Sequence, residues 1–248
     1  MRFRRIEHGV VDSTSERAFE AIAGGQARHG DVHVARAQTA GRGRRGRSWW
    51  SPPDEGLYLS LVLLPPPPSW SPASLTIASG LAVFDAVGAL GLRGARLDWP
   101  NDLVVHEAKL AGVLVETRGL DPEHPHYVVG LGLNVRQREF PAEMLEERRL
   151  ASLRTLGLDL PIDAVLETAL EALGRRVDQV SRDLAGLGTD YLRATRLEGR
   201  AVRVREGEEI HVGRLEDLSV SEGILLRAAD GSERRFALET VREVAASL

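Results

Sequence analysis

Cysteine is the first residue type that the sequence lacks, since none occurs among its 248 residues. This absence excludes disulfide bonds, thiolate nucleophiles and metal centres ligated by cysteine. An excess of positive charge is missing as well, because 32 Lys and Arg residues stand against 36 Asp and Glu residues and leave a formal charge of -4. No global positive field draws the chain to nucleic acid, so we expect no DNA partner, and any basic chemistry must be local.

Long uninterrupted apolar runs are also absent. The first 16 residues lack the apolar core of a signal peptide, and the apolar runs elsewhere are too short or too interrupted by polar residues to cross a bilayer. We therefore expect a cytoplasmic protein with no membrane partner. We also expect no helix-turn-helix domain, because there is no room for one before Asp12.

Two catalytic signatures are missing. The sequence contains neither HExxH, the paired histidines of zinc hydrolases, nor the GxSxG turn that presents a catalytic serine. Four of the histidines are interpreted as scattered solvated residues: His29, His33, His124 and His126. We therefore expect no metal bound by the protein and no covalent enzyme nucleophile.

Hydrophobic periodicity predicts a larger domain with helices and strands, followed by a small β domain. Ser13 and Glu16 have the spacing of a capping box, which begins a helix that should end at Gly24 and Gly25. Further strands are expected at residues 32–37, 57–64, 96–99, 103–106, 109–117 and 127–135, and helices at 71–91 and 161–183. From about Gly199 onward, short alternating runs separated by glycines predict a small β-barrel or sandwich.

A loop rich in arginine and glycine, QTAGRGRRGR at residues 38–47, lies between two predicted strands. Glycines let the backbone bend toward a ligand, while guanidinium groups bind carboxylate or phosphate oxygens in pairs. Trp49 and Trp50 follow directly and offer rings on which a base can stack. The loop therefore indicates an anion site, although composition alone also fits a disordered basic turn or an RNA-binding stretch.

The segment after the second helix brings a lysine near a carboxylate. Pro100 favours an extended backbone at Trp99, and Asn101 and Asp102 then follow at the end of a strand. Lys109 lies seven residues later, across a predicted hairpin, so both ends should meet at one pocket. The alternative for this segment alone is a plain turn with a solvated lysine.

Two glycines interrupt the last predicted strand of the larger domain. Gly130 and Gly132 lie in an apolar run that ends near Asn134, its one strongly polar side chain. Glycine within a strand often marks close approach by a ligand or a neighbouring group, while a β-bulge is the structural alternative.

Five segments, taken together and in this order, closely resemble those of biotin–protein ligases. They are DST at residues 12–14, the arginine loop at 38–47, WPND at 99–102, KLAG at 109–112 and GLGLN at 130–134. Each motif is weak alone, but the combination is specific and covers most of the chain. The resemblance implies an α/β (α+β) catalytic domain related to class II aminoacyl-tRNA synthetases over residues 1–195, and a C-terminal SH3-like β-barrel over residues 196–248.

The resemblance also implies an activity. Members of this family activate biotin with ATP, which carries Mg²⁺, to give biotinyl-5′-AMP. They then transfer biotin to a lysine of a biotin carboxyl carrier protein, such as that of acetyl-CoA carboxylase. We expect the ligase-only type without repressor activity, and a homodimer is compatible with the resemblance.

Motif positions imply three overlapping sets of site residues. Catalytic roles are implied for Lys109, Arg42 and Arg44. Biotin contacts are implied for Ser13, Thr14, Ser15, Gln38, Gly41, Arg42, Gly43, Arg44, Lys109, Gly112 and Gly130. ATP contacts are implied for Arg44, Arg47, Trp49, Asn101, Asp102, Lys109 and Asn134. Among them, Lys109 is the central cation, Trp49 packs on adenine and Asp102 helps to place Mg²⁺.

Three positions depart from the family pattern. Asp98 occupies a position that is usually basic, Ser15 stands where asparagine is common, and the closing FALETVREV matches only loosely, so no site residue is assigned there. Lipoate–protein ligase, which uses the same adenylate chemistry without this arginine loop, is the nearest alternative. An RNA-binding module is the alternative of a different class, which the acidic net charge disfavours.

Overall fold

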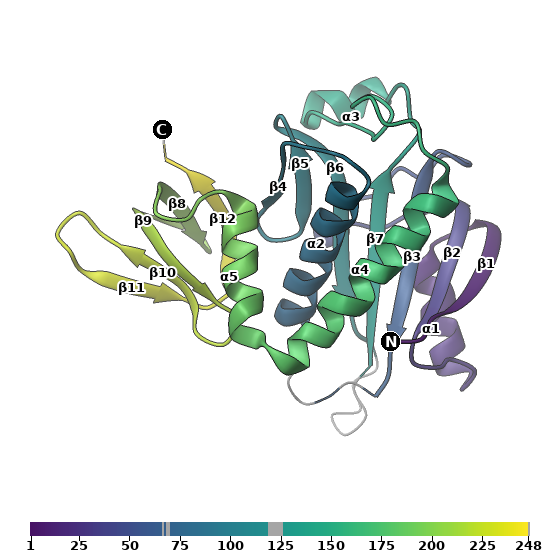
Figure 1. Ribbon diagram of the computed structural model, residues 1–248, viewed down its shortest axis with the longest axis horizontal. Helices are drawn as coiled ribbons and strands as arrows, with labels where there is room; N and C mark the ends of the chain where they lie inside the picture. Colours follow the sequence, from purple (N-terminus) through teal and green to yellow (C-terminus); the bar gives the residue numbers. More distant parts are fainter. Residues whose placement is uncertain (66, 68–69, 119–125, 248) are drawn as a thin grey trace.

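A seven-stranded mixed sheet organises the first part of the chain (Figure 1). The computed structural model describes residues 1–65, 67, 70–118 and 126–247. The strand order is β1-β2-β3-β7-β6-β5-β4, in which β1 and β2 are parallel and the other neighbours antiparallel. The strands are β1 (Arg4–Val11), β2 (Asp31–Gln38), β3 (Gly56–Leu63), β4 (Ala95–Asp98), β5 (Asp102–Val105), β6 (Ala108–Glu116) and β7 (Tyr127–Asn134).

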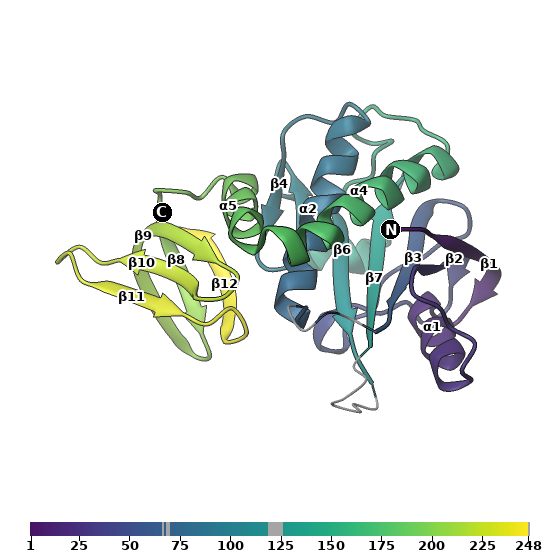
Figure 2. The ribbon, with the colours of Figure 1, turned by 60° about the horizontal axis from the view of Figure 1, so that its bottom comes forward.

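Helices cover both faces of this sheet. On one face α1 (Thr14–Ala23) packs Phe19 against Val62 of β3 and Val128 of β7. The adjacent Leu61 and Leu63 point to the other face, where they join the main core with α2 (Pro72–Ala89) and α4 (Ile162–Arg182). Figure 2 shows α2 and α4 side by side over this face. The sheet is therefore the middle layer of a three-layer α/β arrangement.

The central helix α2 is apolar on all sides. Ser71 caps its first turn in a capping box with Ser74, and Pro72 occupies the first turn, where its missing N–H leaves no bond unmade. Among the described helices, α2 alone is long and apolar enough to cross a membrane, but most of it is buried inside the protein, against the sheet, α4 and α5. We therefore assign it to the core.

A second, antiparallel sheet follows α5 (Leu184–Thr195). Its order is β11-β10-β9-β8-β12, from the strands β8 (Ala201–Glu206), β9 (Glu209–Ser219), β10 (Gly223–Arg227), β11 (Glu233–Phe236) and β12 (Val241–Ala246). This confirms the change to short strands after Gly199. The pairings of the described residues leave β11 and β12 as edges, so the SH3-like barrel and the boundary at residue 195 stay predictions.

The predicted helices and strands match the structure to within one or two residues at most ends, but three elements were missed. The strand β1 has a mostly exposed, charged sequence without clear alternation, while α3 (Ala142–Glu147) is short and buries none of its residues. The third, α5, begins directly after α4 and ends at the expected domain boundary.

The interpretation of the histidines as solvated was wrong for one of them. His33 is buried on β2 and stacks on His8 of β1, with 3.0 Å between His33 Nδ1 and His8 Nε2. His29 is exposed, His126 is half-buried, and His124 lies outside the described residues.

Candidate active site

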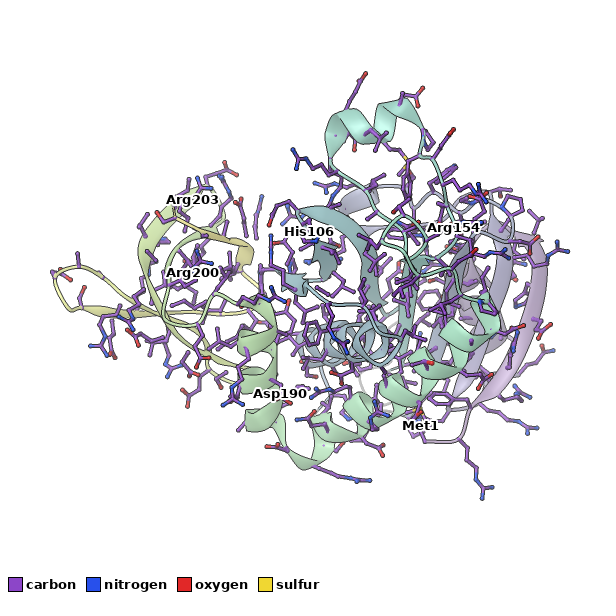
Figure 3. The ribbon with its side chains drawn as sticks, turned by 45° about the horizontal axis from the view of Figure 1, so that its top comes forward. Met1, His106, Arg154, Asp190, Arg200 and Arg203 are labelled. Carbon is purple, nitrogen blue, oxygen red and sulfur yellow. The ribbon has the colours of Figure 1, made fainter. Side chains whose placement is uncertain are left out.

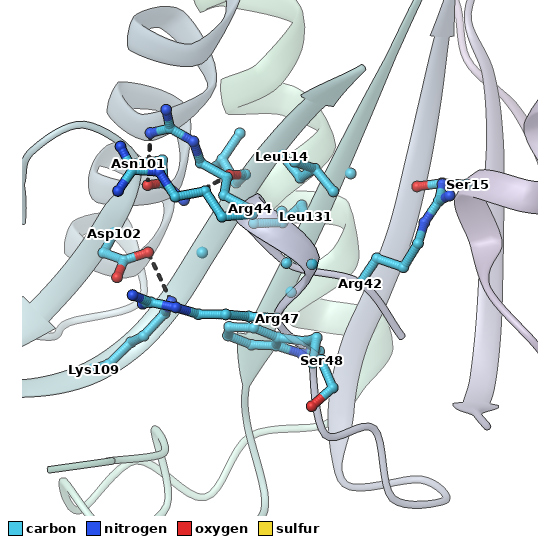
Figure 4. Close-up of a pocket in the computed structure, with 18 of the residues that line it drawn as sticks. Ser15, Arg42, Arg44, Arg47, Ser48, Asn101, Asp102, Lys109, Leu114 and Leu131 are labelled. Atoms are coloured by element: carbon cyan, nitrogen blue, oxygen red, sulfur yellow. Dashed lines mark hydrogen bonds and ion pairs between the residues drawn. The ribbon is translucent and has the colours of Figure 1, made fainter. Parts of the chain in front are cut away.

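One cavity of about 610 Å³ collects most of the predicted site residues (Figure 4). Its walls come from the start of α1, the loop between β2 and β3, the β4–β5 turn, β6, β7 and the segment that follows α3. The predicted residues that line it are Ser13, Thr14, Ser15, Gln38, Arg42, Gly43, Arg44, Arg47, Trp49, Asn101, Asp102, Lys109, Gly112 and Gly130.

A network of hydroxyl and amide groups forms one end of the cavity. Ser13 caps α1 by accepting a hydrogen bond from the Ser15 N–H, and Gln38 Oε1 accepts one from the Thr14 N–H at 2.9 Å. The fully buried Ser60 Oγ lies 2.8 Å from Thr14 Oγ1 and 3.0 Å from Ser15 Oγ. These bonds fix the polar side chains, so this end is a preorganised site for an uncharged polar group.

In the middle of the cavity, a strip of the sheet carries no side chains of its own. Gly112 of β6 and Gly132 of β7 face each other in the ladder, and the Trp49 ring lies over them. A Cβ atom at Gly132 would be only 2.3 Å from Trp49 Cε2, and one at Gly112 would be 3.1 Å from Cζ3. The register of β7 is unbroken beside both neighbours, which favours the close-approach interpretation of its glycines over the bulge.

Three charged side chains meet at the other end. Lys109 Nζ lies 2.8 Å from Asp102 Oδ1, and Arg148 Nη1 donates to Asp102 Oδ2 at 2.7 Å. The hairpin prediction is confirmed, because β5 and β6 pair and bring Lys109 to Asp102. Burial lowers the pKa of Lys109, Asp102 opposes that shift, and the charges of Arg148 and Arg47 add to it. The ammonium group therefore lies in a largely desolvated place, where it interacts strongly with any incoming anion.

The arginine loop divides into a fixed part and a part that faces the cavity. Arg42 forms ion pairs with Glu16 of α1 and Glu116 of β6, and Arg118 also pairs with Glu16. These carboxylates already neutralise Arg42. The expected binding of substrate anions by Arg42 therefore stays a prediction that these ion pairs do not favour. The same pairs explain why Glu16 does not complete the expected capping box.

The exposed arginines of the loop lie at the cationic end. Arg44 Nη1 donates to Asn101 Oδ1 at 3.3 Å, and Figure 4 shows Arg47 extending toward Lys109 and Asp102. Arg45 adopts the left-handed backbone region with φ 58, which turns the chain sharply at this point. Arg44, Arg45 and Arg47 therefore line the cavity without an ion pair to any described residue, whereas Arg42 is paired with two carboxylates.

Two predicted site residues do not line the cavity. Asn134 is buried. Its Nδ2 donates to the Ala151 carbonyl at 3.0 Å, and its Oδ1 accepts from Gln137. Both bonds hold the chain that follows β7, and the side chain does not face the cationic end of the cavity. Gly41 is packed against the Trp49 carbonyl, with no space for a Cβ atom. Neither residue lines the cavity in this structure, and their expected ligand contacts stay predictions.

The sequence also missed residues that complete the site. Ser60 was hidden inside an apolar strand, and Arg148 and Arg242 approach from distant segments without any local motif. The burial of β3 on both faces is the one signal that bears on Ser60, since a serine in a fully buried strand needs a hydrogen-bond partner. Asp98, which occupies a usually basic position, forms an ion pair with Arg96 at 2.8 Å. This pair neutralises the carboxylate beside the cavity.

The fold and the cavity together define a class of protein, one with a hydroxyl-rich end and a cationic end of a single cavity on a mixed sheet. Residues 8–134 match the model of the Biotin/lipoate A/B protein ligase family. The chain belongs to this family.

The similar proteins agree with that assignment. The chain is 34% identical over 199 residues to the Biotin--[acetyl-CoA-carboxylase] ligase of Mycobacterium tuberculosis, covering 77% of this chain and 71% of that protein. It is 36% identical over 138 residues to the Bifunctional ligase/repressor BirA of Salmonella typhimurium, covering 56% of this chain and 42% of that protein, which is less than half its length. The biotin protein ligase from Aquifex aeolicus in complex with biotin and ATP superposes with a TM-score of 0.81 at 30% identity, covering 98% of this chain and 99% of that one.

Proposed function

We propose that this protein activates biotin with ATP to biotinyl-5′-AMP and transfers biotin to a specific lysine of a biotin carboxyl carrier protein, such as that of acetyl-CoA carboxylase. The observation that carries the proposal is the single cavity with a polar end around Thr14 and a cationic end around Lys109. A biotin molecule offers a polar ureido head at one end and a carboxylate at the other. The polar end of the cavity suits the ureido head, and the cationic end suits the carboxylate.

The first step joins two negatively charged groups. An oxygen of the biotin carboxylate attacks the α-phosphorus of ATP, the bond to the bridging oxygen breaks, and pyrophosphate leaves. This step needs no nucleophile from the protein. The protein holds the reactants in line and stabilises the negative charge on the phosphoryl oxygens. Lys109 is proposed to do this at the α-phosphate, with Arg44 and Arg47 on the phosphate oxygens.

The second step releases AMP. The amine of the carrier lysine attacks the acyl carbon of the adenylate, an amide bond forms, the acyl–oxygen bond breaks, and the amine proton passes to solvent. Charge now develops on the acyl oxygen, which is separated from the α-phosphorus of the adenylate by only the acyl carbon and one bridging oxygen. We propose that Lys109 stabilises this oxygen also, so one cation serves both half-reactions.

Mg²⁺ is proposed to arrive with ATP rather than to belong to the protein. When bound, it neutralises triphosphate charge. Among residues 1–65, 67, 70–118 and 126–247, no cluster of three or more histidine, aspartate or glutamate side chains could hold a metal. The Asp102 carboxylate is engaged by Lys109 and Arg148, so it does not fit a metal ligand as it is arranged here.

Further features of the protein are part of the same proposal. The small C-terminal sheet is proposed to be the SH3-like unit of residues 196–248, and Arg242 of β12 supports its approach to the nucleotide end because it lines the cavity. We propose a cytoplasmic enzyme without DNA or membrane partners, which acts on the carrier protein. A homodimer is compatible with this proposal, and sedimentation of the purified protein tests it.

The decisive experiment measures pyrophosphate released from ATP with biotin, with lipoate, or with neither, followed by transfer to a carboxyl carrier domain. We expect release only with biotin, and biotin on one carrier lysine by mass spectrometry. Turnover with lipoate alone would overturn the substrate assignment in favour of lipoate ligation. Binding of RNA without turnover of either acid would favour the RNA-binding alternative.

A further inference from the structure

Asp102 is shared by two cations from different parts of the chain. Lys109 on β6 occupies one carboxylate oxygen and Arg148 the other, at 2.8 and 2.7 Å. The side chains of Asp102 and Lys109 are 15% and 16% exposed, so both charges are largely removed from water. The cluster has one negative and two positive charges, one more cation than the carboxylate alone requires.

Backbone hydrogen bonds hold Arg148 beside Lys109. The Lys109 N–H donates to the Arg149 carbonyl at 2.8 Å, and the Ala151 N–H donates to the Lys109 carbonyl at 2.9 Å. These bonds form a short parallel bridge between Lys109 and Leu150, so the chain after α3 runs along the edge of β6. The position of Arg148 is therefore set by the backbone and does not depend on Asp102 alone.

The proposed chemistry requires Lys109 to turn toward a substrate oxygen. If Asp102 had no second partner, this movement would leave a buried carboxylate unpaired, which is strongly unfavourable. With Arg148 in place, Asp102 keeps a charge-assisted hydrogen bond while the ammonium group is away. Lys109 can then exchange between Asp102 and the substrate without exposing an uncompensated charge.

We propose that Arg148 is a positioning residue that keeps Asp102 paired and thereby frees Lys109 for the substrate. The inference rests on the proposed function, in which Lys109 is the central cation. It concerns a residue that contacts the reaction only through Asp102 and Lys109. Arg148 should act in both half-reactions, because both use the same ammonium group.

Single-turnover adenylate formation tests this inference in the full chain. We expect Arg148→Ala to slow adenylate formation at least tenfold, while Arg149→Ala, at the exposed neighbour outside the cavity lining, stays within twofold of wild type. If Arg148→Ala folds poorly, Arg148→Gln keeps the first three side-chain carbons and a polar end and removes the charge, with the same expected loss. Arg148→Lys should restore part of the rate, because it returns the charge without the two-pronged geometry.

A double-mutant cycle separates positioning from a merely structural role. In an Asp102→Asn background Lys109 is no longer held by a carboxylate, so removing Arg148 should change the rate less than threefold. An equal loss from Arg148→Ala in both backgrounds, or a near wild-type rate for Arg148→Ala alone, overturns the proposal.

A measurement without substrate keeps the inference separate from the proposed function. The initial rate at which acetic anhydride modifies Lys109 is followed by mass spectrometry in wild type and in Arg148→Ala. Loss of the nearby positive charge should raise the pKa of Lys109 and slow its modification at least twofold near neutral pH. Equal or faster modification contradicts the role of Arg148. Failure of wild-type protein to form any adenylate contradicts the proposed function instead.

Discussion

The two ends of the cavity are built on opposite principles. At the polar end, Thr14 and Ser15 bond to one buried serine, Ser60, so each group has a neutral partner that stays in place. At the cationic end, Lys109 and Arg148 share one carboxylate, so the Lys109 bond can be exchanged for one to a substrate anion while Arg148 keeps the carboxylate paired. In the proposed reaction, the polar end recognises a group that does not change, whereas the cationic end must stabilise charge at two successive places. Under that proposal, fixed neutral bonds serve selectivity and an exchangeable ionic bond serves catalysis.

Removal of the lysine should break the cationic end and leave the polar end intact. We expect Lys109→Ala to slow single-turnover adenylate formation at least a hundredfold, about 2.7 kcal/mol of barrier. Biotin affinity, measured by calorimetry, should fall far less than the rate, because the ureido head keeps its hydroxyl network and only the carboxylate loses a cation. A near-normal single-turnover rate would remove Lys109 from the mechanism.

The sheet beneath the polar end should be sensitive to acid. Burial, with the charge of His8 adding to it, lowers the pKa of His33 from 6.5 to about 4, and Arg17 and Arg4 also disfavour the charged ring while Asp31 opposes them. Between these pH values the unfolded chain therefore binds more protons than the folded chain. The contribution of His33 to the free energy of unfolding is complete above pH 6.5 and is lost as the pH falls toward 4.

A variant without the titrating group measures this contribution. Between pH 7 and pH 4, wild type should lose on the order of 2 kcal/mol more stability in denaturant titrations than His33→Leu. Parallel losses in the two proteins would show that His33 does not supply the pH dependence.

Deletion of one hydroxyl should sharpen the comparison further. Ser60→Ala removes the shared partner of Thr14 and Ser15, so biotin binding should weaken about fivefold, or ~1 kcal/mol. The adenylation rate at saturating biotin should hardly change. Ser79→Ala is the matched control, since Ser79 is equally buried on α2 and its hydroxyl has no hydrogen-bond partner among the described residues. Equal effects of the two substitutions on biotin affinity would deny Ser60 its role.

The smallest effect is expected where the C-terminal sheet reaches the cationic end. Arg242→Ala should raise the KM for ATP about twofold, because an exposed charge contributes only ~0.5 kcal/mol. Arg203→Ala is the control, on a strand of the same sheet whose residues do not line the cavity (Figure 3). An unchanged KM in both variants would limit the cationic end to the larger domain.

The sequence predicted the elements that carry strong local signals. The helix at Ser71 and Pro72 and the buried strand β3 were found because capping residues and unbroken apolar runs act over a few positions. The strand β1 was missed because it is an edge strand, in which parallel pairing with β2 matters more than its own exposed residues. Tertiary pairing of this kind leaves little trace in a single segment.

In the site, as in the fold, local contacts were predicted and distant contacts were missed. Lys109 and Asp102 were brought together correctly because one hairpin joins them. Arg148 could not be found, since its contact with Asp102 spans 46 positions and depends on a backbone bridge. The role given to Arg42 did not anticipate Glu16 and Glu116, because acidic residues on α1 and β6 have no fixed spacing from the loop.

Two positions in the middle of this cavity that leave little room for a substitution have no side chain at all. Gly112 and Gly132 leave the sheet surface one atom layer lower, and the Trp49 ring lies in that depression with Lys109 Nζ 5.1 Å from its centre. Even an alanine at Gly132 would force the ring to move away from the sheet and would change its contact with Lys109. A library that varies the cavity to accept other carboxylic acids should therefore hold these two glycines constant and diversify the walls around them.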